Sequence, residues 1–126
     1  MDCKVDMTNA RQVFDSMLGG AIPSRPPFLP FVEPLAARVG GVGYREMTGD
    51  ATAWTNSLAK TADLLGLDAV AVGFDTALSA ESIAAETTGT ADELNESWVP
   101  SGRLAAALDT AGRLFQTQRA ARGCVA

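Results

Sequence analysis

Residues 25–32 (RPPFLPFV) and residues 65–75 (LGLDAVAVGFD) are the two stretches that decide the fold class predicted for this chain. Each contains an apolar run of strand length, and the segment between them has the apolar spacing of a helix. A continuous run such as residues 69–74 is typical of a parallel strand buried on both faces. We therefore expect an α/β protein with parallel strands at residues 28–32 and 69–74, and with residues 124–126 starting another strand.

Helix signals surround these runs. Asp50 can cap a helix that Gly66 then ends, because glycine readily takes the left-handed conformation past a helix terminus. Pro34 suits the first turn of a short helix. Ser79 and Ser101 are placed to cap two later helices. We expect the long helices to bury the stripes Trp54, Leu58, Ala62, Leu65 and Leu104, Leu108, Ala111, Phe115.

Composition limits the function classes. A chain of 126 residues forms one domain at most, since domains commonly run to about 100–150 residues. The net charge of −5 and the absence of a basic cluster argue against nucleic acid binding. No apolar run approaches the roughly 20 residues that cross a bilayer, and the charged N-terminus does not resemble a signal peptide. We expect a cytoplasmic protein that uses neither nucleic acid nor membrane as a partner.

Histidine and cysteine usage restricts the chemistry. The chain has no histidine, which excludes histidine-based triads and histidine-ligated zinc within these residues. Its cysteines, Cys3 and Cys124, lie near opposite ends. A disulfide between them is one reading, and a cytosolic setting favours free thiols.

Charged residues next to the predicted strands are the candidates for a site. Asp75 follows the second strand, where catalytic groups of a β/α barrel sit, and an acidic helix cap is the ordinary alternative. Glu33 follows the first strand and has the same two readings. Arg38 and Arg45 lie around the first strand and the loop after it, and their guanidinium groups match carboxylates or form surface salt bridges.

Several stretches resemble uroporphyrinogen decarboxylase-like proteins. They are residues 25–28, residues 65–75, residues 80–89 and the segment 102–126. In that family these positions correspond to the beginning of an eight-fold β/α barrel. The resemblance covers nearly the whole chain but only the front part of a typical member. It implies that residues 1–126 are an N-terminal fragment of one (β/α)8 barrel domain, and that the isolated fragment is inactive.

The resemblance also implies a reaction. Uroporphyrinogen decarboxylase removes carboxyl groups from acetate side chains of a tetrapyrrole in porphyrin biosynthesis, without metal or organic cofactor. Asp75 matches the family aspartate that contacts the pyrrole nitrogens, where a fixed carboxylate stabilises the charge of a protonated ring. The family's Arg-Gln-Ala-Gly-Arg-Tyr motif is replaced by residues 33–38, EPLAAR. Arg38, Tyr44 and Arg45 are its stand-ins for substrate binding, and Glu33 joins them.

Two alternatives remain open. The same superfamily contains zinc-dependent methyltransferases that act on corrinoid proteins, and their zinc ligands would lie in a later part of a full-length parent. The chain could also be a truncated product without catalysis. The partner is accordingly a tetrapyrrole or a corrinoid protein, and the resemblance allows a homodimer in the full-length form.

Overall fold

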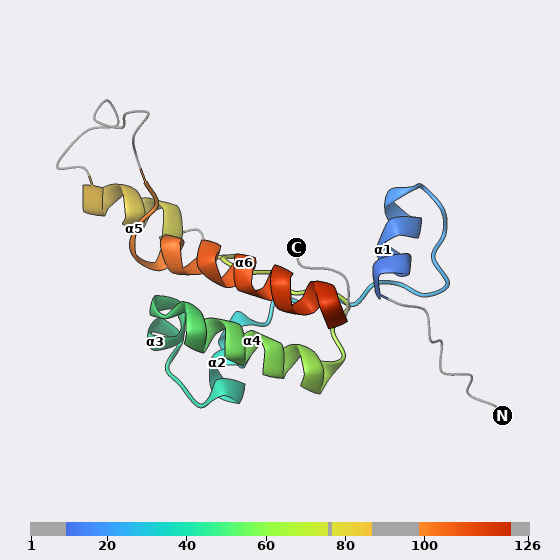
Figure 1. The fold of residues 1–126 in the computed structure, drawn as a ribbon, viewed down its shortest axis with the longest axis horizontal. Helices are drawn as coiled ribbons and strands as arrows, with labels where there is room; N and C mark the ends of the chain where they lie inside the picture. The colour runs from blue at the N-terminus through green and yellow to red at the C-terminus, as the bar shows by residue number, and fades with distance from the viewer. Residues whose placement is uncertain (1–9, 76, 87–98, 122–126) are drawn as a thin grey trace.

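The computed structural model describes residues 10–75, 77–86 and 99–121, and every regular element in these ranges is an α-helix. Figure 1 shows α6 running along α4, α2 and α3 packed on α4, and α5 beside the start of α6. The helices are α1 (Ala10–Leu18), α2 (Glu33–Gly40), α3 (Tyr44–Gly49), α4 (Ala51–Leu65), α5 (Ala77–Glu86) and α6 (Gly102–Ala121).

The predicted α/β class with parallel strands is wrong, because the described residues contain no strand. Residues 28–32 and 69–74 do not form a sheet with each other. Pro30 cannot donate a ladder hydrogen bond. Gly73 has a φ of 76°, which no regular strand adopts. The third predicted strand, residues 124–126, lies outside the described residues.

An ion pair instead holds the two apolar segments side by side. Arg25 donates two hydrogen bonds to the carboxylate of Asp68, from Nη1 to Oδ2 at 2.6 Å and from Nη2 to Oδ1 at 2.7 Å. The amide of Phe28 donates to Asp68 Oδ2 at 2.7 Å, and the amide of Asp68 donates to the carbonyl of Phe28 at 3.0 Å. The bidentate contact with Arg25, followed by the Phe28 amide, holds the pKa of Asp68 below its usual value.

Most of the predicted helix ends are confirmed. Asp50 Oδ1 accepts hydrogen bonds from the amides of residues 52 and 53 at the start of α4, and Gly66 ends α4 with a φ of 64°. Pro34 stands in the first turn of α2. Ser79 is not a cap, because α5 already begins at Ala77, whose amide donates to Asp75 Oδ1 at 2.9 Å.

The core lies where α2, α3 and α6 meet α4. Trp54 and Leu58 of α4 are fully buried against it, as predicted, whereas Leu65 is exposed. The predicted stripe of α6 is partly wrong: Leu108 and Phe115 are exposed, and the helix buries the neighbouring face, which contains Ala107, Thr110 and Leu114.

Candidate functional site

Glu33 is the buried carboxyl group of the candidate site. It is the first residue of α2 and only 4% exposed. Its Oε1 accepts the amide hydrogen of Gly73 at 2.7 Å, which ties α2 to the segment before α5. Burial raises the pKa of Glu33, and the nearby charge of Asp75 raises it further, while backbone amides of Gly73 and Phe74 oppose the change.

The indole N–H of Trp54 lies next to this carboxyl group. It has no hydrogen bond of good geometry among the described residues, yet it is close enough to Glu33 to help lower the pKa of that group. Trp54 is fully buried in α4, so this contact links the Glu33 carboxyl group to the core of the protein.

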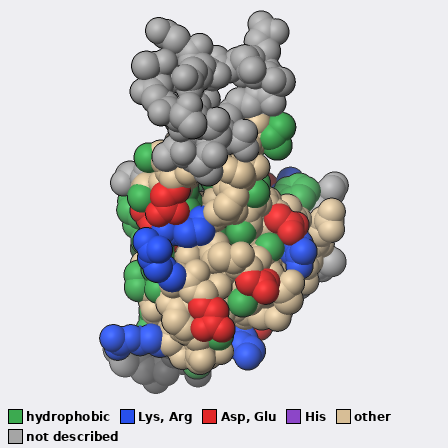
Figure 2. All heavy atoms as spheres, turned by 90° about the vertical axis from the view of Figure 1, so that its left-hand side faces the viewer, with side chains coloured by type: hydrophobic (Ala, Val, Ile, Leu, Met, Phe, Trp, Pro, Cys, Tyr) green, Lys and Arg blue, Asp and Glu red, His purple; other side chains and the backbone are tan. Residues whose placement is uncertain are grey.

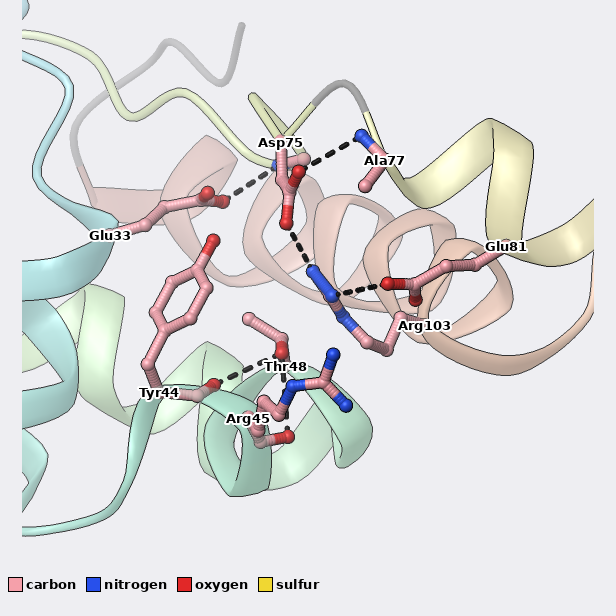
Figure 3. A network of polar contacts seen from close by, with 9 residues as sticks. Glu33, Tyr44, Arg45, Thr48, Asp75, Ala77, Glu81 and Arg103 are labelled. Carbon is pink, nitrogen blue, oxygen red and sulfur yellow. Dashed lines mark hydrogen bonds and ion pairs between the residues drawn. The ribbon is translucent and has the colours of Figure 1, made fainter.

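Asp75 is held from two sides. Its Oδ1 accepts the amide of Ala77, and its Oδ2 is paired with Nη2 of Arg103 from α6. The other terminal nitrogen of Arg103 donates to Glu81 Oε1 of α5 at 3.0 Å. Figure 3 shows Arg103 lying between the two carboxylates. These contacts, and not a β-sheet, therefore fix the orientation of the Asp75 carboxylate.

Tyr44 completes the polar group. It begins α3, and Figure 3 shows its hydroxyl pointing toward the space between Glu33 and Asp75. Burial raises the pKa of Tyr44, and the negative charges of Glu33 and Asp75 raise it further, whereas Arg103 acts in the opposite direction. The potential around this hydroxyl is thus dominated by carboxylates.

A cavity of about 290 Å³ opens between these side chains, and most of its wall is apolar. The rings of Phe31 and Phe74 stack on each other beside it, with centroids 3.9 Å apart and planes inclined by 19°. Its lining consists of Phe31, Glu33, Pro34, Tyr44, Ala71, Phe74 and Asp75. The volume lies just below the range of roughly 300–1,000 Å³ found for ligand sites.

Three of the five residues predicted for the site come together here: Glu33, Tyr44 and Asp75 all line the cavity. Arg38 and Arg45 do not. Both are exposed, on α2 and α3 respectively, and neither forms an ion pair with another described residue.

Sequence reasoning missed Arg103 and the aromatic pair Phe31 and Phe74. Arg103 gives no local signal, because it meets Asp75 only through the packing of α6. The two phenylalanines had a signal, since each stands within two positions of a candidate carboxylate, but they were assigned to strands.

The distribution of charge and the grouping of possible metal ligands are two further features of the part of the chain that the structure describes. On the face shown in Figure 2, acidic and basic side chains are interspersed, so the part of it that the structure describes carries no extended basic patch. Within residues 10–75, 77–86 and 99–121, no three His, Cys, Asp or Glu side chains are grouped as metal ligands would be. None of the described helices combines the length and the apolar character needed to cross a membrane.

Comparisons with known proteins give no relative: no protein-family model, curated protein or solved structure matches the chain. The site must therefore be interpreted from its own chemistry.

Proposed function

We propose that the chain forms part of the substrate site of a uroporphyrinogen-type decarboxylase, and that the cavity receives a pyrrole ring of the tetrapyrrole. The observation that supports this proposal is the convergence of Glu33, Tyr44 and Asp75 on one cavity from three separate segments. The resemblance in sequence assigns the pyrrole contact to Asp75.

The environment of Asp75 suits that role. The amide of Ala77 and the guanidinium of Arg103 already fix the orientation of its carboxylate. A fixed carboxylate accepts the N–H of a pyrrole and stabilises the positive charge that develops when the ring is protonated, without reorganising during the reaction. The protonated ring then takes up the electron pair of the breaking carbon–carbon bond as carbon dioxide leaves the acetate side chain.

The size of the cavity fits a ring rather than a whole macrocycle. The carboxylates of the substrate then remain outside the cavity, where they avoid electrostatic repulsion from Glu33 and Asp75. Arg45 directly follows Tyr44 on α3, and Arg38 lies in the last turn of α2. Both guanidinium groups are exposed, and their planar forks match carboxylates.

Anaerobic calorimetric titration with uroporphyrinogen tests the proposal. We expect saturable binding, and we expect Asp75→Asn to weaken it at least about tenfold, because a charge-assisted hydrogen bond contributes about 1.5–3 kcal/mol. Asparagine also caps helices well, so the start of α5 is retained. The matched control is Asp109→Asn, which removes a carboxylate on the exposed side of α6.

Failure of the wild-type protein to bind uroporphyrinogen would contradict the proposal. Equal binding by the wild type and Asp75→Asn would remove Asp75 from the site. Circular dichroism of each variant checks that the helices are intact.

A further inference from the structure

We infer that this cavity binds an organic cation, an alkylated ammonium or a positively charged ring, between its aromatic side chains and its carboxylates. The inference rests on the proposed function only in that the cavity holds a ligand, and it does not require a tetrapyrrole. It follows from the charge around the cavity, from its aromatic wall and from one polar group that points into it.

The charges around the cavity favour a cation. Glu33 and Asp75 are in its wall, and Glu81 is joined to Asp75 through Arg103. This group contains three carboxyl groups and a single guanidinium, whose two terminal nitrogens are both engaged. A cation that enters gains attraction from the excess negative charge, whereas an anionic group meets repulsion.

The same excess is visible at Tyr44. Burial raises the pKa of Tyr44, and the charges of Glu33 and Asp75 raise it further, so a negative charge on the Tyr44 oxygen is disfavoured at this position. Arg103 compensates only in part. A positively charged ligand beside the Tyr44 hydroxyl would reduce the electrostatic repulsion between the carboxyl groups of Glu33 and Asp75.

The wall favours a cation with an apolar body over a hydrated metal ion. Phe31, Phe74 and Tyr44 contribute rings, and most of the surface inside the cavity is apolar. Phe31 and Phe74 are 59% and 60% exposed although they stack on each other, so a large aromatic area remains open to a ligand. Aromatic rings attract alkylated ammonium groups through their electron-rich faces, and this combination with carboxylates is a recurring way to recognise such ligands.

The hydroxyl of Tyr44 is the polar group that points into the site. It is directed at the space between Glu33 and Asp75, and it lies close enough to Arg103 for that side chain to lower the pKa of Tyr44. A ligand N–H or hydroxyl placed there would find the oxygen of Tyr44 and the carboxyl group of Glu33 as acceptors, and the Gly73 amide already holds Oε1 of Glu33 in place.

The test uses two probes of the same shape. Choline carries a quaternary ammonium, and 3,3-dimethylbutan-1-ol replaces its nitrogen by carbon. Both are titrated into the ¹⁵N-labelled protein, and the amide resonances of Gly73 and Phe74 are followed. We expect saturable shifts with choline, and binding of the neutral alcohol at least about tenfold weaker.

Variants identify the groups responsible. Phe74→Leu and Asp75→Asn should each weaken choline binding several-fold. Phe28→Leu is the matched control, because Phe28 is similarly exposed but does not line the cavity. An unchanged affinity in Phe74→Leu would contradict the role of the aromatic wall.

The outcomes separate this inference from the tetrapyrrole proposal. Equal binding of choline and the alcohol, or no binding of choline, overturns the inference. Binding of uroporphyrinogen without binding of choline supports the proposed function alone. Binding of choline without binding of uroporphyrinogen supports the cation site and contradicts the tetrapyrrole proposal.

Discussion

Replacing Asp68 by alanine is the most informative test of how the chain is held together. This side chain is 6% exposed and joins the segment before α2 to the segment after α4. The substitution removes two hydrogen bonds from Arg25 and one from the amide of Phe28. It leaves the backbone bond from the amide of residue 68 to the carbonyl of Phe28 in place.

The expected loss is about 3 kcal/mol. Hydrogen bonds to charged groups contribute about 1.5–3 kcal/mol each, and removing one partner of a buried ion pair costs about 3–5 kcal/mol. The lower end applies here because the Arg25 side chain is 32% exposed and regains water when its partner is removed. For a chain of this size the loss corresponds to a fall of about 10 °C in Tm.

Urea and thermal unfolding followed by circular dichroism measure this loss. Asp109→Ala is the control, because it breaks an exposed pair within α6 and should unfold close to the wild type. If Asp68→Ala is as stable as Asp109→Ala, the ion pair does not hold the two segments together and the reasoning is refuted.

The same residue gives a pH dependence with a defined sign. The pKa of Asp68 is lower in the folded protein than in the unfolded chain, chiefly because of Arg25. Its contribution to stability is therefore fully present above the unfolded pKa and is lost as the pH falls through the folded pKa. The stability difference between wild type and Asp68→Ala should shrink in acid, and a difference that stays constant down to pH 2 would contradict this assignment.

Two further substitutions test local packing and capping. Gly40→Ala would place its Cβ 2.0 Å from the Oγ of the buried Ser57, so we expect a loss of about 1–3 kcal/mol in urea unfolding, while Gly49→Ala, which has open space, should lose far less. Equal losses would contradict the close contact of α2 with α4. Asp50→Ala removes the side-chain acceptor at the start of α4 and should lower Tm, whereas Asp50→Asn should retain most of it. Identical melting of these two variants would show that the side chain does not cap the helix.

Signals that act within a few residues could be predicted from the sequence. Asp50, Gly66 and Pro34 mark helix ends through their own hydrogen bonds or dihedral angles, and the structure has them there. The secondary structure of residues 69–74 could not be predicted in the same way. A short apolar run is equally compatible with a strand and with a buried irregular segment. The contact of Arg25 with Asp68 and the left-handed Gly73 decide against a strand.

The residues of the candidate site likewise fall into those with a signal in the sequence and those that depend on how the helices pack. Glu33 and Asp75 could be predicted because each directly follows a predicted strand, and an element boundary stays near the same position when the element is of another type. Tyr44 was predicted only through the family resemblance. Arg103 could not be found, since its contact with Asp75 depends on how α6 packs. Arg38 and Arg45 were grouped with the site by chain proximity, but helical geometry turns both toward solvent.

A pH titration of the Gly73 amide by NMR tests whether the cavity contains a buried carboxyl group of Glu33 that is bonded to that amide. Burial outweighs the hydrogen bonds to this carboxyl group, so the folded pKa of Glu33 is above its usual value. The titratable groups that act on it are Asp75, which raises its pKa, and Tyr44, whose own pKa responds to the charge of Glu33. The measurement is repeated in Glu33→Gln to separate the titration of Glu33 from that of Asp75.

We expect the Gly73 resonance to titrate with a pKa above the usual value for glutamate. Glu33→Gln should abolish this transition, and Asp75→Asn should move it to lower pH. A Gly73 amide that does not respond to Glu33, or one that reports a pKa at or below the usual value, would contradict the account.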